Sequence, residues 1–334
     1  MRVLVTGGSG YIGSHICRVL ADRGDTPVIV DDFAHGLRHR IDGMPAHELD
    51  LAEPGAAGVL ARLVADEGVE AVIHLAARKQ VGESVARPLW YHRQNVGALT
   101  SVLQAMVATG VRDLVFSSSA AVYGDADGVV TEDAPTVPVN PYGETKLAGE
   151  WLAADVARAD GLRVTSLRYF NVAGAGWPDL ADTAVLNLVP MVLEAIDAGR
   201  SPQIFGDDYP TADGTCVRDF VHVRDLADAH LAVLDALPEQ PEPHRSYNVG
   251  TGVGSSVRDV VEGIRHRIAD APATVTRPRR PGDPAAVVAD VSRIADELGW
   301  RARHDLDDIL DSVLAARELV QSPPPRAVAS GCER

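Results

Sequence analysis

The sequence has few cysteines, a deficit of basic residues and no long apolar run. Its 334 residues contain three cysteines, Cys17, Cys216 and Cys332, which lie far apart and lack metal-ligand spacing. They predict a reducing compartment, no disulfide framework and no metal site. The net charge of −16 argues against general nucleic-acid binding. Since no apolar run is long enough for a signal peptide or a membrane span, we expect a cytoplasmic protein without a membrane anchor.

A glycine-rich turn follows the first apolar run. Residues 3–6 predict a short buried strand, and Gly7, Gly10 and Gly13 lie between it and an amphipathic helical pattern. Such glycines allow a tight turn and the close approach of a dinucleotide diphosphate to the helix N-terminus. The alternative is a glycine-rich turn with no ligand. The position between a strand and a helix favours a dinucleotide site.

An acidic residue ends the second predicted strand, residues 28–30. Asp31, and less directly Asp32, stands about 20 residues beyond the glycine turn, where a carboxylate accepts from the adenosine ribose hydroxyls. It repels a 2′-phosphate, so NAD is favoured over NADP. Arg38 and Arg40 follow and weaken this preference. The alternative role for Asp31 is to cap its own loop.

Other polar residues lie at predicted strand ends and inside one helix. Asp50 and Leu51 follow a third strand and could frame an adenine. Residues 71–77 predict a fourth strand that ends in small residues, over which a cofactor can lie flat. The helix predicted for residues 88–109 contains Asn95, a poor helix former, which could bond a loop that holds the cofactor.

A tyrosine and a lysine one helical turn apart form the most reactive pair in the sequence. The apolar strand at residues 114–116 runs into Ser119, and Pro141 suits the first turn of the next helix. Tyr142 and Lys146 on that helix share a face, so the cation can favour a phenolate base. The Ser119 hydroxyl could pass or share the proton. Alone, such a pair is more often a surface feature; the glycine turn upstream favours catalysis.

The element pattern predicts an α/β fold, a doubly wound parallel Rossmann-type sheet with a smaller C-terminal α/β substrate domain. Strands alternate with helices up to Asn171, and the composition then shifts towards Gly, Ala, Pro and Asp. We expect the NAD-binding domain at 1–171, with 219–248 returning to it. The substrate domain covers 172–218 and 249–320, and 321–334 form a flexible tail.

Several short motifs, in this order, resemble the UDP-galactose 4-epimerase family of the extended short-chain dehydrogenase/reductase superfamily. The resemblance covers roughly residues 1–318 and is specific because all the motifs occur together. They are the glycines at 7, 10 and 13, residues 79–84 (KQVGES), 117–124 (SSSAAVYG), the Tyr142/Lys146 pair, 167–171 (LRYFN), 205–211 (FGDDYPT), 217–223 (VRDFVHV) and 280–283 (RPGD).

The resemblance implies a role for each matching position, a homodimer through the helices near 92–108 and 144–158, and 4-epimerisation of a UDP-hexose. The implied catalytic residues are Ser119, Tyr142 and Lys146. The implied NAD-binding residues are Gly7, Gly10, Tyr11, Ile12, Gly13, Asp31, Asp50, Leu51, Ala76, Lys79, Asn95, Tyr142 and Lys146. The implied UDP-sugar-binding residues are Lys79, Ser119, Tyr142, Asn171, Asn187, Phe205, Arg218, Arg280, Asp283 and Val287.

Two arginines and one valine in the implied substrate site can be argued from their chemistry. Arg218 and Arg280 suit a diphosphate because a guanidinium forms bidentate hydrogen bonds, although surface ion pairs are the alternative. In the resembling family, a tyrosine at the position of Val287 goes with plain UDP-hexoses, and smaller residues go with tolerance of an N-acetyl group. Val287 therefore predicts that tolerance, unless its neighbours refill the space.

The rival functions share parts of this residue set. Related nucleotide-sugar 4,6-dehydratases place an Asp-Glu pair just after the position of Ser119, and related uronic acid decarboxylases place a glutamate there. This chain has Ala120 and Ala121, which carry no proton to transfer. A reductase for an uncharged substrate would not need the two arginines. A non-catalytic NAD-binding scaffold often loses the tyrosine or the lysine, and this chain keeps both.

Overall fold

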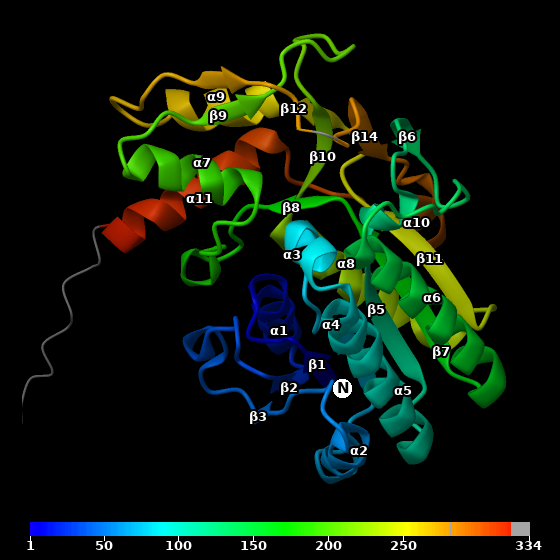
Figure 1. Cartoon of the computed structure of the whole chain (residues 1–334). Helices are drawn as coiled ribbons and strands as arrows, with labels where there is room; N and C mark the ends of the chain where they lie inside the picture. The colour runs from blue at the N-terminus through cyan, green and yellow to red at the C-terminus, as the bar shows by residue number, and fades with distance from the viewer. Residues whose placement is uncertain (281, 322–334) are drawn as a thin grey trace, which may run out of the picture.

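The computed structural model describes residues 1–280 and 282–321. Pro281 of the RPGD motif and residues 322–334 of the predicted tail lie outside the described residues, as does Cys332. Gln321, the first residue of the predicted tail, is the last residue of a helix. The chain forms two units, a larger one built on a seven-stranded sheet and a smaller one above it (Figure 1).

The larger unit contains a fully parallel sheet with the order β11-β7-β5-β4-β1-β2-β3. The order reverses direction at β1 and β4, so that a crevice opens at the carboxyl ends of these strands. The predicted parallel, doubly wound sheet is confirmed. Its strands are β1 (Arg2–Thr6), β2 (Thr26–Asp31), β3 (Ala46–Glu48), β4 (Ala71–His74), β5 (Asp113–Ser119), β7 (Arg163–Tyr169) and β11 (His244–Val249).

Alternate residues of these strands bury opposite faces of the sheet. In β1, Val3 and Val5 pack into one apolar cluster and Leu4 into the other. The helices α1, α8 and α10 cover the first face, and α2, α5 and α6 cover the second. Because both faces are covered, the middle residues of the central strands are mostly apolar on both faces, as in other parallel sheets.

The helices of this unit follow its strands along the chain, and α8 with β11 returns to it after the smaller unit has begun. They are α1 (Tyr11–Arg23), α2 (Ala56–Asp66), α3 (Val81–Ala86), α4 (Pro88–His92), α5 (Ala98–Thr109), α6 (Pro141–Asp160), α8 (Val223–Ala236) and α10 (Ser292–Leu298), with the short 3-10 helices η1 (Arg38–Ile41), η3 (Ala120–Tyr123) and η5 (Leu237–Glu239).

The smaller unit packs three helices against short strands. Its sheet has the order β12-β10-β14-β6, with β8 also paired to β10, and β9 pairs with β13. These elements are β6 (Gly128–Val130), β8 (Asn171–Ala173), β9 (Gln203–Phe205), β10 (Val217–His222), β12 (Gly254–Ser256), β13 (Val275–Arg277), β14 (Ala286–Ala289), α7 (Leu188–Asp197), α9 (Val257–His266), α11 (Leu306–Gln321) and the 3-10 helix η4 (Pro178–Leu180).

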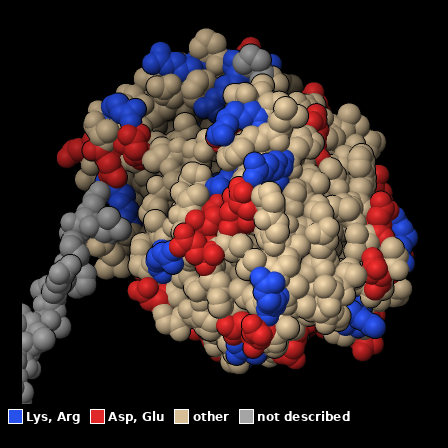
Figure 2. Space-filling view, turned by 60° about the horizontal axis from the view of Figure 1, so that its bottom comes forward, with Lys and Arg blue, Asp and Glu red and all other residues tan. Residues whose placement is uncertain are grey.

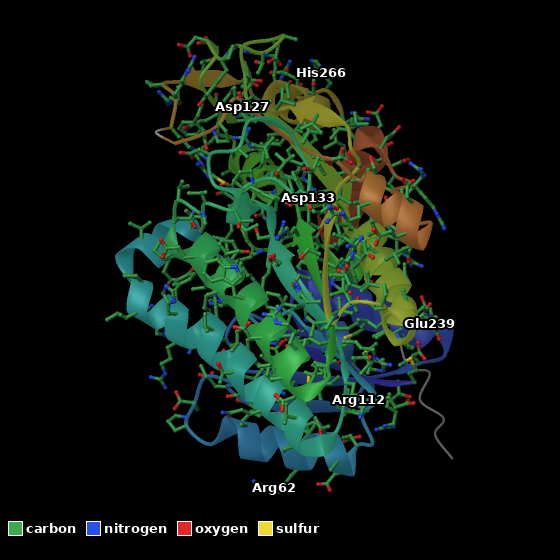
Figure 3. All side chains as sticks on the ribbon, turned by 90° about the vertical axis from the view of Figure 1, so that its right-hand side faces the viewer. Arg62, Arg112, Asp127, Asp133, Glu239 and His266 are labelled. Atoms are coloured by element: carbon green, nitrogen blue, oxygen red, sulfur yellow. The ribbon has the colours of Figure 1, made fainter. Side chains whose placement is uncertain are left out.

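One early segment crosses from the larger unit to the smaller one. The strand β6 pairs with β14 more than 150 residues further along the chain, and the Asp127 carboxylate accepts from the Ala286 amide at 3.0 Å. Figure 3 places Asp127 at the end of the molecule that holds His266, far from Arg62 and Arg112. This crossing connects the loop after β5 to the smaller unit.

The single helix predicted for residues 88–109 is interrupted. A π-helical turn, η2 (Arg93–Gly97), separates α4 from α5, and Asn95 lies within it. A π turn widens the helix by one residue and is common at functional sites. Here it turns the Asn95 amide towards the core, where Asn95 is 6% exposed.

The surface has mixed charge. On the face drawn in Figure 2, acidic and basic side chains are interspersed around tan, uncharged areas. Within residues 1–280 and 282–321, no helix combines the length and the apolar character that crossing a membrane requires.

Candidate active site

The glycine turn between β1 and α1 has no room for side chains. Gly7 has φ of +73°, and its amide donates to the Val30 carbonyl at 2.8 Å. A Cβ on Gly7 would lie 2.8 Å from the Ala76 amide nitrogen, and one on Gly13 would lie 2.2 Å from the Gly7 carbonyl oxygen. Gly10 caps α1 without any side chain, so the amides of the first turn face open space.

A cavity of about 460 Å³ opens above this turn. Of the predicted NAD-binding residues, all except Asn95 line it: Gly7, Gly10, Tyr11, Ile12, Gly13, Asp31, Asp50, Leu51, Ala76, Lys79, Tyr142 and Lys146. The residues that the sequence singled out over 140 positions thus meet in one space. Its lining combines glycines and apolar residues with a smaller number of polar and charged groups, which is the usual form of a small-molecule site.

Asp31 caps its own loop and also lines the cavity, so ribose binding by its carboxylate stays a prediction. Its carboxylate accepts from the Ser9 amide at 3.0 Å and from the Phe33 amide at 2.9 Å, so it caps the loop. A carboxylate has about four lone-pair sites, and Asp31 also lines the cavity, which leaves acceptors for ribose hydroxyls. Arg38 is turned away, with its guanidinium 3.6 Å above the Phe33 ring and paired with Glu48.

Asn95 acts behind the cavity. Its Oδ1 accepts from the Arg78 amide at 2.8 Å, and its Nδ2 donates to the Arg78 carbonyl at 3.0 Å and to Thr145 Oγ1 at 2.9 Å. It therefore fixes the loop before Lys79 to the helix that carries Tyr142. Asn95 thus bonds a loop that lines the cavity; that this loop holds the cofactor, and that Asn95 contacts it directly, stay predictions.

Helix α6 presents Tyr142 and Lys146 to this space. The Asn140 side chain accepts from the Gly143 amide at 2.9 Å, and Pro141 occupies the first helical position, so the helix begins just before Tyr142. The Lys146 ammonium is buried, lies 6.0 Å from the centre of the Tyr142 ring and donates to the Ser117 carbonyl at 2.7 Å.

The environment of these two groups shifts their pKa values. Burial raises the pKa of Tyr142, and a hydrogen bond with the Ser119 hydroxyl lowers it. Burial lowers the pKa of Lys146 to about 8, and the Glu150 carboxylate opposes that shift. An ammonium within about 6 Å also favours the phenolate. The phenol is thus buried beside one hydroxyl and one cation, as a candidate general base.

A buried ion pair lies behind the reactive pair. Arg168 on β7 donates to the Glu150 carboxylate at 2.7 and 3.0 Å and to the Tyr123 hydroxyl at 2.9 Å. Ser118 donates to the same carboxylate. Glu150 lies one turn beyond Lys146 on α6, so this pair fixes the helix against the strand that carries the serines.

A second cavity, of about 670 Å³, adjoins the first. Tyr142, Lys79, Tyr11 and Ile12 line both. Nine of the ten predicted substrate residues line the second cavity: Lys79, Ser119, Tyr142, Asn171, Asn187, Phe205, Arg218, Arg280 and Asp283. Tyr142 therefore lies where the two cavities meet.

The two predicted arginines are not in surface ion pairs. Arg218 on β10 donates to the Val217 carbonyl at 2.8 Å and to the Pro284 carbonyl at 2.9 Å. The Arg280 guanidinium lies 3.9 Å from the centre of the Phe205 ring. Among the described residues neither has a carboxylate within 4.0 Å, so both keep donors for an anion.

Val287 is not among the cavity-lining residues. It lies on β14 in register with Arg218, half-buried against an apolar cluster that contains Val122, Tyr123 and Phe170. Neighbouring side chains thus occupy part of the space around it, as the alternative interpretation held. Direct contact between Val287 and a sugar stays a prediction.

Comparison with known proteins assigns the family. The model of the NAD dependent epimerase/dehydratase family matches residues 3–250. A UDP-glucose 4-epimerase of Azospirillum brasilense is 44% identical over 329 residues, covering 96% of this chain and 93% of the relative. The chain belongs to the UDP-glucose 4-epimerase family. The sequence motifs predicted this membership correctly.

Two solved structures of family members superpose closely. The UDP-glucose-4-epimerase of Stenotrophomonas maltophila, crystallised with NAD and formylated UDP-arabinopyranose, is 38% identical, with a TM-score of 0.90 over 96% of this chain and 99% of that one. The UDP-Glc/GlcNAc 4-epimerase of Campylobacter jejuni is 35% identical, with a TM-score of 0.82 over 95% of this chain and 99% of that one.

The first cavity fits the NAD of this family. The glycine turn leaves no space for a Cβ beneath it, the α1 amides are open, and Asp31 stands at the rim. The residues that would hold NAD are the glycine turn, Asp31, Asp50 and Lys79. NAD is accordingly the cofactor of this family member.

Several residues of this epimerase site carried no assigned role in the sequence interpretation. Tyr169 lines both cavities, and its hydroxyl donates to His230 at 2.5 Å; its signal was the LRYFN motif. Asp182 and Leu186 also line both cavities, from the Gly- and Asp-rich loop after β8. A further signal lies in composition: the only two lysines of the chain, Lys79 and Lys146, both line the cofactor cavity.

Proposed function

We propose that the protein interconverts UDP-glucose and UDP-galactose by NAD-dependent 4-epimerisation. The observation that carries this proposal is the position of Tyr142, whose side chain lines both the cofactor cavity and the adjoining cavity with Arg218 and Arg280. A base at this junction can reach a sugar hydroxyl while the nucleotide remains bound further out. The family membership supports the same reaction.

We propose the following role for each residue of the site. Tyr142 takes the proton from the sugar 4-hydroxyl, directly or through Ser119, and returns it at the end of the reaction. When bound, NAD supplies reversible hydride transfer at the sugar carbon and a positive ring whose charge favours the phenolate. Lys146 supports the same charge on Tyr142. Arg218 and Arg280 hold the UDP diphosphate while the 4-keto sugar rotates in the pocket and presents its opposite face.

The test is turnover of UDP-galactose by purified protein with no added cofactor. Because the reaction has no net redox change, retained NAD should suffice and UDP-glucose should form. Conversion that depends stoichiometrically on added NAD would contradict the proposal. Retained cofactor, assayed after denaturation, should be NAD and not NADP, because the Asp31 carboxylate lines the cavity and would repel a 2′-phosphate.

The residues after Ser119 favour epimerisation over 4,6-dehydration. Ala120 and Ala121 line the second cavity, and neither carries a proton to give or accept. We expect no 4-keto-6-deoxy product from UDP-glucose or dTDP-glucose. Mass spectrometry of the products after long incubation gives the answer, and the appearance of a 4-keto-6-deoxy sugar would favour a dehydratase.

We also propose that acetylated substrates are accepted. The support is the absence of an aromatic ring at Val287, beside Arg218, and the name of the Campylobacter jejuni relative as a UDP-Glc/GlcNAc 4-epimerase. The ratio of kcat/KM values for acetylated and plain substrates should fall in Val287→Tyr. An unchanged ratio would mean that Val287 is not the determinant.

A homodimer is proposed through α4 and α5, which follow one another across η2, and α6, which lies beside both (Figure 1). Leu89 on α4 is 87% exposed and Trp151 on α6 is 61% exposed, and Val85 on the adjoining α3 is 62% exposed. Light scattering should give twice the chain mass, and Trp151→Glu should yield monomer. The control is Val253→Glu, at a valine that is 67% exposed on the smaller unit. A monomeric parent protein contradicts the proposal.

The proposed division of labour between the units can be tested by hydrogen exchange. We propose that residues 1–171 with 219–248 bind NAD, and that 172–218 with 249–320 bind the UDP-sugar. ADP should then protect mainly the first set of amides and UDP the second. Reversed protection would overturn this assignment.

A cytoplasmic location is proposed as well. The two described cysteines, Cys17 and Cys216, are both buried and unpaired, as in a reducing compartment. Cell fractionation with an antibody against the protein tests this location, and recovery outside the cytoplasmic fraction contradicts it.

A further inference from the structure

A buried arginine in the cofactor cavity forms no salt bridge with any described residue, and the Asp182 carboxylate acts on it only from beyond 4.0 Å. Arg40, on the 3-10 helix η1, is 8% exposed and lines the cavity above the glycine turn. Its Nη2 donates to the Ala181 carbonyl at 2.5 Å and, at 3.4 Å, to Thr183 Oγ1. Its Nε is buried and donates to nothing, and within the described part of the chain no carboxylate lies within 4.0 Å of it.

This state is costly for the protein alone. Burial lowers the pKa of Arg40 and the Asp182 carboxylate opposes that shift, yet the guanidinium stays charged throughout the physiological range and has no carboxylate within hydrogen-bond reach among the described residues. A buried charge that lacks a counter-ion destabilises the fold unless an anion compensates it. The neighbouring Arg38 shows the ordinary alternative, because it is exposed and paired with Glu48.

The position of Arg40 determines which diphosphate it can bind. The reaction involves two diphosphates, one in the cofactor and one in the UDP-sugar. Arg40 lines the cavity of Gly7, Gly10 and Gly13, whereas Arg218 and Arg280 line the other. The cofactor diphosphate is therefore the one that Arg40 can reach.

Arg40 also acts electrostatically on the start of α1. Burial raises the pKa of Tyr11 and lowers that of His15 to about 4, and the Arg40 charge acts on both groups. The N-terminus of α1 is where a dinucleotide diphosphate sits in this type of fold. Arg40 and the uncapped amides after Gly10 thus face the same part of the cavity.

We propose that Arg40 binds the diphosphate of the cofactor and connects it to the loop that carries Asn187. Arg40 donates to the carbonyl of Ala181. The next residue, Asp182, accepts through its carboxylate from the side-chain amide of Asn187 at 2.9 Å. Arg40 is thus a cofactor ligand on one side and a support for the substrate loop on the other. This inference rests on the use of NAD by the family.

The test compares ligands with and without phosphates. Full-length protein freed of retained nucleotide is titrated with ADP and with adenosine by calorimetry, as parent, Arg40→Gln, Arg40→Lys and the matched control Arg38→Gln. A charge-assisted hydrogen bond is worth about tenfold to a hundredfold in affinity. Arg40→Gln should lose about that factor for ADP and keep its adenosine affinity within about twofold, while Arg38→Gln matches the parent.

Each other outcome has a definite meaning. Equal ADP affinity in Arg40→Gln overturns the proposal, and so does an equal loss for adenosine, because Arg40 would then only shape the cavity. If Arg40→Gln does not fold, Arg40→Lys decides: it keeps the charge but not the bidentate geometry, so its ADP affinity should be reduced. Failure of the parent to bind ADP would contradict NAD use by this protein, separately from any role of Arg40.

Discussion

The Lys146 ammonium donates a hydrogen bond of 2.7 Å to the backbone carbonyl of Ser117, on the strand that also carries Ser119. This contact joins α6, which carries Tyr142, to β5, which carries Ser119. It fixes the cation 6.0 Å from the centre of the Tyr142 ring. The proposed catalytic residues are therefore positioned by one another and by backbone, not by solvent-exposed side chains.

Replacement of this lysine should change the pH dependence of turnover. In Lys146→Met the cation that favours the Tyr142 phenolate is gone, so the pKa of Tyr142 rises further and the remaining activity appears at higher pH. The pH profile of kcat with UDP-galactose measures this shift. An activity loss without an alkaline displacement would limit Lys146 to a structural role.

Removal of one hydroxyl group should abolish most of the turnover. Tyr142→Phe keeps the ring that packs between the two cavities but removes the general base. We expect a loss of about 10²-fold to 10⁴-fold in kcat, with NAD content unchanged. Near-normal turnover would reject Tyr142 as the base. Tyr209→Phe, at a buried tyrosine outside both cavity linings, is the matched control.

The substrate arginines should act on affinity. Arg280→Gln removes a guanidinium that lies over Phe205 and has no carboxylate partner among residues 1–280 and 282–321. The KM for UDP-galactose should rise by about tenfold to a hundredfold with a smaller change in kcat. Its neighbour Arg279, paired with Asp208, provides the control Arg279→Gln. An equal effect of both substitutions would point to nonspecific charge.

Buried neutral histidines should make the protein sensitive to acid. His15 accepts from the Gly176 amide at 3.0 Å through Nε2, and burial lowers its pKa to about 4. His230 is buried against Tyr169, and burial lowers its pKa to about 4 as well. The unfolded chain binds protons near pH 6.5, so stability is present above that pH and is lost as the pH falls towards 4.

Urea unfolding at pH 7.5 and pH 5.5 measures this loss. The midpoint concentration should drop between the two conditions, and His15→Gln should show a smaller drop. The exposed His266 on α9 provides the control His266→Gln, which should behave as the parent. Identical pH dependence in all three proteins would exclude the histidine explanation.

Local sequence patterns predicted most of the larger unit. The glycine turn, Asp31, and the pairing of Tyr142 with Lys146 could be recognised because each needs a fixed spacing on one strand or one helix. The parallel sheet followed from alternation of strands and helices. The positions of these elements in the structure agree with those expectations.

Long-range contacts were beyond the reach of these patterns. The π turn at Asn95 depends on partners at Arg78 and Thr145, which lie 17 and 50 positions away. The Glu150 carboxylate acts on the pKa of Lys146, and Arg168 pairs with that carboxylate only because β7 packs against α6. In the sequence Arg40 is only a basic residue that follows a strand; the fold shows that it is buried, with an Nε that lacks a hydrogen-bond partner among the described residues.

The central claim is that hydride leaves C4 of the sugar and returns to the same carbon. The fate of the hydrogen atom at C4 tests this claim most directly. Purified protein is incubated with UDP-galactose deuterated at C4, and the UDP-glucose formed is examined by mass spectrometry and NMR. If the hydride leaves and returns to the same carbon within one active site, the deuterium stays at C4 and no cofactor is consumed. Loss of the deuterium to solvent, or inversion only with stoichiometric consumption of added NAD, would contradict the account.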